Sequence, residues 1–208
     1  MTISDKKALL RRAVSEGLSA LSEKSLSEKS ARITNALQAL PEYEGAQSIF
    51  VFIAVQREPD TRALIENALL SGKTVAVPLT YPGGKMSLRV IKELSELVPG
   101  LYGIPVPPET APEVSPEDID LAVIPAVAYD KGCRRLGRGG GYYDRFLSGF
   151  RGFSVGICFS ECTFFEIIPC EEHDEPVCAV VTDAGVYRNH NKCLFPVRKR
   201  AELQECAE

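Results

Sequence analysis

The chain has 208 residues, 45% of them hydrophobic, a formal charge of -4 and a pI near 5.4. The acidic balance argues against general nucleic-acid binding. No apolar run reaches the ~20 residues of a membrane span, and the N-terminus lacks the apolar core of a signal peptide. We therefore expect a cytoplasmic protein with neither nucleic acid nor membrane as a partner, and a monomer or weak dimer.

Hydrophobic periodicity predicts helices that alternate with short buried strands. The first helix, over residues 5–20, has apolar residues at helical spacing and basic residues between them, and such charges are most simply a solvated helix face. Apolar runs rich in β-branched residues predict strands buried on both faces, as in a parallel sheet. Further helices are predicted over 27–40, 59–72 and 142–147, and strands over 48–54, 73–77, 87–91, 121–124, 155–158 and 177–181.

This alternation indicates the α/β class with a largely parallel sheet. We expect one domain over residues 1–189, a long ordered surface loop over 98–117, and a polar tail over 190–208 to which no role is assigned.

The most informative stretch is R-L-G-R-G-G-G-Y-Y-D-R over residues 135–145, with four glycines and three arginines. Glycine lets the backbone adopt positive φ and approach a ligand closely. Successive exposed N–H groups form a concave anion site, to which arginines add charge. A mobile surface loop is the alternative. The position between a predicted strand and a predicted helix favours the anion site, since open α/β sheets bind ligands there. The stretch predicts phosphate binding.

The seven cysteines show no C-x-x-C pair and are expected to be free thiols in a reducing compartment. A zinc site is the disfavoured alternative, because the spacings match no common zinc template. Its ligands would be Cys158, Cys162, Cys170, Cys178 and His173.

Four segments resemble the 5-formyltetrahydrofolate cyclo-ligase family. They are K-A-L-L-R at 7–11, I-A-V-Q-R-E-P-D-T at 53–61, the region 125–147 around the glycine run, and P-C-E-E-H-D at 169–174. The third is highly specific, whereas the first and last are weak alone. The resemblance implies ATP-dependent, magnesium-requiring closure of 5-formyltetrahydrofolate to 5,10-methenyltetrahydrofolate through phosphorylation of the formyl oxygen, with release of ADP and phosphate. It also implies a three-layer α/β/α domain similar to ribose-5-phosphate isomerase and CoA transferases.

The resemblance also assigns residues, carried over position by position. ATP binding is expected at Lys6, Lys7, Arg11, Arg135, Leu136, Gly137, Arg138, Gly139, Gly140, Gly141, Tyr142 and Tyr143. Folate binding is expected at Ile53, Glu58, Arg138, Gly139, Gly140, Gly141 and Tyr142. Magnesium is expected at Asp144 and Asp174. Arg138 and Lys7 are expected to be catalytic by neutralising phosphate charge, and Arg138 is expected to hold the transferring phosphoryl group with the N–H groups of Gly139 to Gly141.

Two positions depart from the family pattern. Gly140 stands where some relatives have a lysine, so Arg138 and Lys7 must supply more of the positive charge. Cys162 stands where a glutamine is frequent, which weakens the case for a polar folate contact there. Of Tyr142 and Tyr143 we expect one to flank the ligand and one to pack inward. The role of His173 stays open: it could be a general base, a partner to a phosphate or a structural residue. The structural role is preferred.

Three rival functions remain open. R-G-G-G-Y-Y resembles segments of single-strand RNA binders, but it occurs once, between buried strands, in an acidic chain. A family member that binds its ligands without turnover is the second. A sugar-phosphate isomerase on the same fold is the third, and dependence on ATP would separate it from the ligase.

Overall fold

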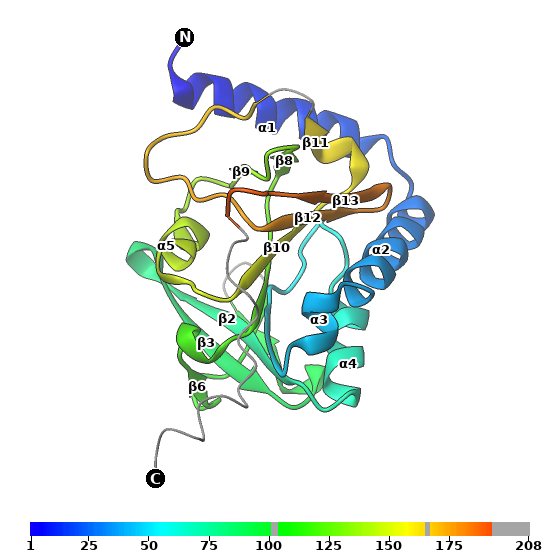
Figure 1. Cartoon of the computed structure of the whole chain (residues 1–208), viewed down its shortest axis with the longest axis vertical. Helices are drawn as coiled ribbons and strands as arrows, with labels where there is room; N and C mark the ends of the chain where they lie inside the picture. The colour runs from blue at the N-terminus through cyan, green and yellow to red at the C-terminus, as the bar shows by residue number, and fades with distance from the viewer. Residues whose placement is uncertain (101–103, 165–166, 193–208) are drawn as a thin grey trace.

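The computed structural model describes residues 1–100, 104–164 and 167–192 and is built around an eight-stranded sheet of order β13-β12-β10-β7-β1-β2-β3-β6 (Figure 1). The inner strands are parallel: β12 (Ala179–Thr182), β10 (Phe153–Ile157), β7 (Leu121–Ile124), β1 (Ser48–Val51) and β2 (Thr74–Tyr81). The outer strands are antiparallel to their neighbours: β13 (Gly185–Arg188), β3 (Lys85–Ile91) and β6 (Glu113–Val114).

Helices cover both faces of this sheet (Figure 1). On one side lie α2 (Glu23–Gln38), α3 (Pro41–Gly45) and α4 (Arg62–Leu70), and on the other α5 (Tyr142–Gly149). The fifth helix packs Phe146 against Phe50 of β1 with ring centroids 5.0 Å apart. This confirms the expected α/β/α layering and largely parallel sheet. In the described residues, no helix has both the length and the apolar character that crossing a bilayer requires.

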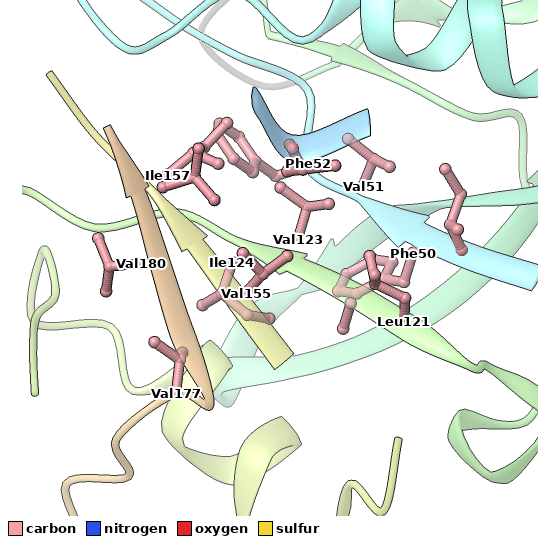
Figure 2. Close-up of a cluster of buried hydrophobic side chains, with 14 of the residues drawn as sticks. Phe50, Val51, Phe52, Leu121, Val123, Ile124, Val155, Ile157, Val177 and Val180 are labelled. Carbon is pink, nitrogen blue, oxygen red and sulfur yellow. The ribbon is translucent and has the colours of Figure 1, made fainter. Parts of the chain in front are cut away.

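Every residue of β1, β7, β10 and β12 is buried (Figure 2). A strand with helices on both faces is largely apolar along its whole length rather than at alternate positions. The continuous runs that predicted these strands therefore reflect their central place in the sheet.

The boundaries of several elements differ from expectation. The strand predicted over 48–54 ends at Val51, because the Thr61 hydroxyl donates to Phe52 O and accepts from Ala54 N, which takes these groups out of the ladder. The second helix begins at Glu23 rather than near residue 27, since the Ser22 side chain caps it.

A second sheet, of order β11-β8-β9, was not predicted. It contains β11 (Thr163–Phe164), β8 (Ala128–Asp130) and β9 (Arg135–Leu136). The glycine run therefore follows a hairpin rather than β7 directly. The hairpin turns at Cys133, a non-glycine residue with φ of 62°.

The proline-rich stretch also contains short strands, β4 (Val98–Pro99) and β5 (Pro105–Val106), besides β6. Residues 101–103 of it, and residues 193–208 of the predicted tail, lie outside the described part of the chain. The remaining short elements are 3-10 helices: η1 (Pro82–Gly84), η2 (Leu94–Glu96), η4 (Pro116–Asp118) and η5 (Ser160–Cys162).

Candidate functional site

Helix α1 (Ile3–Ser19) lies over loops that follow β1, β7 and β10, and a cavity of about 320 Å³ opens beneath it. Arg11, Val14 and Leu18 of α1 line this cavity together with Glu58 and Arg138. A second cavity of about 710 Å³ is bordered by α2, the start of α4 and Ile53. The loops after parallel strands are where α/β sheets bind ligands.

Lys7 of α1 is buried, with 7% of its surface exposed, whereas its neighbour Lys6 is exposed. Its Nζ lies 2.5 Å from Asp174 Oδ2 and 2.9 Å from Glu171 Oε2. Burial disfavours the charged ammonium, but the hydrogen bonds and charges of the two carboxylates outweigh it and raise the pKa of Lys7. The solvated helix face that periodicity suggested does not extend to this residue.

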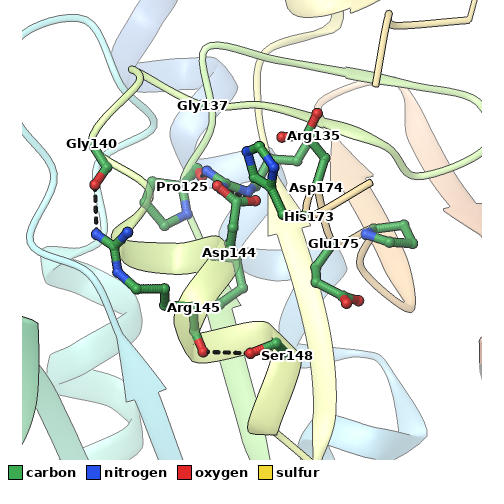
Figure 3. Close-up of polar contacts among 12 residues, drawn as sticks. Pro125, Arg135, Gly137, Gly140, Asp144, Arg145, Ser148, His173, Asp174 and Glu175 are labelled. Atoms are coloured by element: carbon green, nitrogen blue, oxygen red, sulfur yellow. Dashed lines mark hydrogen bonds and ion pairs between the residues drawn. The ribbon is translucent and has the colours of Figure 1, made fainter. Parts of the chain in front are cut away.

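The glycine run bends sharply between β9 and α5. Gly139 and Gly141 have φ of 100° and 66°, and Gly141 precedes α5 without any side-chain cap. Arg11 Nε donates to Gly137 O at 2.8 Å, and Arg145 Nη2 donates to Gly140 O at 2.7 Å (Figure 3). Within the described residues, the backbone N–H groups of 138–141 donate no hydrogen bond. The carbonyls of Gly137 and Gly140 are therefore held, while the backbone donors of 138–141 are available within the described residues.

Arg138 projects from this run and is 56% exposed. Its Nη2 lies 2.7 Å from Glu58 Oε1, which joins the glycine run to the loop after β1. The other oxygen of Glu58 accepts from Val55 N at 3.1 Å. The structure thus places the residue expected to hold phosphate against the one expected to hold folate.

Arg135 is turned into the protein (Figure 3). Its Nη2 lies 2.6 Å from Asp144 Oδ1, its guanidinium lies over the ring of Tyr143, and its side chain is 5% exposed. Its buried Nε has no hydrogen-bond partner among the described residues. Tyr143 also stacks on Phe50, and burial raises its pKa, so Tyr143 is the tyrosine that packs inward.

Tyr142, like Tyr143, is half-buried. Its hydroxyl donates to Tyr81 O at 3.0 Å. This contact ties the start of α5 to the end of β2 and leaves Tyr142 beside the glycine run.

Glu171, His173 and Asp174 form the only group of three or more possible metal ligands among the described residues, with ligand atoms within 4.8 Å of one another. No cysteine takes part. Asp144 is not in this group and is held instead by Arg135. Carboxylate oxygens are ligands that suit magnesium, so the donor type fits, and Asp174 lies where such a group exists.

Comparison with known proteins identifies the family. The sequence profile of the 5-formyltetrahydrofolate cyclo-ligase family matches residues 3–183. The chain belongs to that family. It is 32% identical over 174 residues to the 5-formyltetrahydrofolate cyclo-ligase of Escherichia coli (strain K12), covering 81% of this chain and 95% of the relative. It is 27% identical to the Mus musculus enzyme of the same name over 190 residues, 85% of this chain and 93% of the relative.

A solved structure is similar over nearly the whole cyclo-ligase chain. The NMR structure of Aquifex aeolicus 5,10-methenyltetrahydrofolate synthetase superposes with a TM-score of 0.79 and 30% sequence identity, covering 93% of this chain and 97% of that one. The family fold and the sheet described above therefore agree.

The four cyclo-ligase motif segments, far apart in sequence, meet in the structure. Lys7 binds Asp174 across 167 positions, Arg11 binds Gly137 across 126, and Arg138 binds Glu58 across 80. Ile53 lines the larger cavity and Glu58 lines both. The structure does not place Asp144 with Asp174 in one ligand group.

Two residues of the site were missed by sequence reasoning. Glu171 stands in the P-C-E-E-H-D motif, which was the available signal, but its contact with Lys7 was not expected. Gln56 lines both cavities and has φ of 53°, a backbone feature that the sequence does not reveal.

Proposed function

We propose that this protein closes 5-formyltetrahydrofolate to 5,10-methenyltetrahydrofolate in a reaction that consumes ATP and releases ADP and phosphate. The supporting observation is the convergence of the four family segments through the Lys7–Asp174, Arg11–Gly137 and Arg138–Glu58 contacts. Family membership over residues 3–183 supports the same conclusion. Its cytoplasmic location and its monomeric or weakly dimeric state stay predictions.

The formyl group is the chemical obstacle, since an amide-type carbonyl is a poor electrophile with a poor leaving group. In the proposed path the formyl oxygen attacks the γ-phosphorus of ATP, and the bond to ADP breaks. N10 of the folate then attacks the activated carbon, and the C–O bond breaks to release phosphate, which carries the N10 proton away. Such a path requires positioning and charge stabilisation rather than covalent catalysis by the protein.

Different residues would bind different parts of the two substrates. The free N–H groups of residues 138–141, with Arg138, suit the transferring phosphoryl group. Lys7 and Arg11 would hold the rest of the triphosphate from α1. Glu58 would bind the pterin edge, whose N–H groups are donors. Arg135, turned toward Asp144, would act by fixing the base of the glycine run.

Asp174 and Asp144 are the proposed magnesium residues. When bound, magnesium would neutralise phosphate oxygens during the transfer. Lys7 and Arg135 pair with these two carboxylates in the described structure and compensate their charge.

The deciding experiment follows methenyl-folate absorbance after the protein, 5-formyltetrahydrofolate, magnesium and ATP are mixed. Absorbance should rise only when ATP is present. No rise, together with ATP-independent turnover of a sugar phosphate, would favour the isomerase alternative, and ligand binding without a rise would favour a non-catalytic family member. Retention of RNA by the protein would favour the RNA-binding alternative.

The Arg138→Ala variant tests the proposed phosphate contact. Turnover should fall about 100- to 1000-fold, as is common when one preorganised donor is removed. Arg138 is half exposed, so the melting temperature should stay near that of the wild type. The Arg12→Ala variant is the matched control, because Arg12 lies on α1, is 79% exposed and pairs only with Glu16 in the described residues.

A further inference from the structure

Gln56 occupies an unfavourable backbone conformation at the boundary of the two cavities. Its φ is 53°, a region that side chains other than glycine, asparagine and aspartate seldom adopt. Its side chain is exposed, and it lines both cavities together with Glu58. No hydrogen bond of its carboxamide occurs with any described residue. An amide at this position is available to a ligand that enters either cavity.

The surrounding loop is fixed by contacts that do not involve the Gln56 side chain. Val55 and Glu58 close a turn, with Glu58 N donating to Val55 O at 3.2 Å and Val55 N donating to the Glu58 carboxylate at 3.1 Å. Arg57 Nε donates to Leu18 O at the end of α1 at 2.8 Å. A strained residue persists only where its surroundings impose the conformation, and such residues gather at binding and catalytic sites.

Glycine would adopt this φ without strain, and turns with positive φ at this position ordinarily contain glycine, asparagine or aspartate. A glutamine therefore needs another explanation, and its side-chain chemistry supplies one. A carboxamide offers one acceptor and two donors, whereas the neighbouring Glu58 carboxylate only accepts. The pterin edge of a reduced folate has both N–H donors and a carbonyl acceptor. Glu58 alone satisfies only the donors.

We propose that Gln56 is a specificity-determining residue that hydrogen-bonds the pterin edge beside Glu58, with its N–H donating to the pterin carbonyl. This inference rests on the proposed function, because it takes reduced folate as the substrate. Gln56 acts by binding the substrate and takes no part in phosphoryl transfer. The KM for ATP is therefore expected not to depend on Gln56.

The test uses two substitutions and a matched control in the full-length protein. Gln56→Gly removes the amide and relieves the backbone, and Gln56→Glu keeps the length but loses the N–H donors. Gln47→Gly is the control, since Gln47 is an exposed glutamine just before β1, at the opposite end of that strand. The KM for 5-formyltetrahydrofolate, the KM for ATP, the melting temperature, and folate binding by calorimetry without ATP are measured for each.

Both Gln56 variants should raise the KM and the Kd for 5-formyltetrahydrofolate about 3- to 10-fold, which is the usual effect of one lost hydrogen bond. The KM for ATP should stay within about twofold, and Gln56→Gly should melt at or above the wild-type temperature, because the strain is gone. Gln47→Gly should change neither KM.

Unchanged folate constants would overturn the proposal. A lower melting temperature with both KM values raised would also overturn it, since Gln56 would then only shape the loop. A wild-type protein that binds folate but makes no product would refute the proposed function, and the calorimetric comparison of the variants would still decide the role of Gln56. A wild-type protein that binds no folate would refute both.

Discussion

Two lysines of this protein, the buried Lys7 and the partly buried Lys29, have similar surroundings, although only Lys7 lies in a family motif. Each ammonium contacts an aspartate and a glutamate, at 2.5 and 2.9 Å for Lys7 and at 2.6 and 2.9 Å for Lys29. Their side chains are 9% and 12% exposed. We refer to the Lys7 cluster (Lys7, Glu171 and Asp174) and the Lys29 cluster (Lys29, Glu161 and Asp183).

The clusters differ in how many oxygens of the aspartate stay available to a ligand. Asp183 Oδ1 accepts from Ser160 N at 2.7 Å, while its Oδ2 is held by Lys29, so the protein uses both oxygens. Asp174 receives Lys7 and Glu171 N on Oδ2 alone, and no residue in the described part of the chain donates to its other oxygen. The geometry of the ion pairs therefore does not distinguish the two lysines, and the unused oxygen of Asp174 is the difference on which the proposed role of the Lys7 cluster rests.

Turnover should distinguish the clusters most strongly. Lys7→Met removes a cation proposed to hold phosphate, and we expect about a 100- to 1000-fold loss of turnover. Lys29→Met, the matched substitution, should keep turnover per folded molecule within about twofold. Initial rates normalised to folded protein provide the measurement. Equal losses in the two variants would remove the functional distinction.

Binding of ATP with magnesium should follow the same division. A ligand at 100 times its Kd stabilises the folded state by about 2.7 kcal/mol, which raises the melting temperature of a domain this size by roughly 5–10 °C. Wild type and Lys29→Met should both show this rise in thermal-shift measurements, and Lys7→Met should show little of it. A chelator should abolish the rise in wild type. A chelator without effect would remove magnesium from the proposal.

Without ligand, Lys29→Met should lower the melting temperature more than Lys7→Met does. Lys29→Met leaves Asp183, only 6% exposed, with the more distant Arg32 at 3.9 Å in place of Lys29 at 2.6 Å. Breaking a fully buried pair costs about 3–5 kcal/mol, and partial exposure of Glu161 reduces this to roughly 2 kcal/mol, or about 4–8 °C in melting temperature. The double variant Lys29→Met/Asp183→Asn should recover part of the loss, because the buried side chain that has lost Lys29 is then neutral. Full additivity of the two substitutions would argue that the ion pair contributes nothing.

The fold was predictable where burial alone determines the sequence. The bounds of β7 follow from its apolar run, because a strand covered on both faces is largely apolar along its whole length. The end of β1 was not predictable, since Phe52 is as apolar as Val51 and pairing stops only because Thr61 captures Phe52 O. The short strands β8 and β9 were missed, since runs of three and two residues carry no periodicity.

The site was predictable in composition but not in its contacts. The glycine run could be identified from its residue types and its place before a predicted helix. The burial of Lys7 could not be predicted, because its two carboxylate partners lie 164 and 167 positions away along the chain. Helical periodicity also assigns basic residues to solvent. The inward turn of Arg135 depends likewise on packing around Tyr143.

The smallest expected effect is a change with pH in the difference between the melting temperatures of wild type and Asp183→Asn. Burial raises the pKa of Asp183, but the Lys29 hydrogen bond and Ser160 N outweigh it, so the net pKa is lowered. An aspartate with a folded-state pKa below its unfolded value of ~3.9 stabilises the protein above that value, and this stabilisation is lost as pH falls through the folded pKa. The melting temperature of wild type should therefore exceed that of Asp183→Asn at pH 7.

The excess should shrink as the pH is lowered below about 4, in a series of melts at constant ionic strength. Asp174→Asn should show the same trend, because the pKa of Asp174 is lowered by the equivalent contacts with Lys7 and Glu171 N despite its burial. Asn keeps the shape of Asp but loses the charge and replaces one acceptor oxygen with an NH2 donor, and only the loss of the charge depends on pH. The pH-dependent part of the difference therefore reports the ion pair. An excess that persisted undiminished in acid would mean that hydrogen-bond geometry, rather than charge, holds these carboxylates.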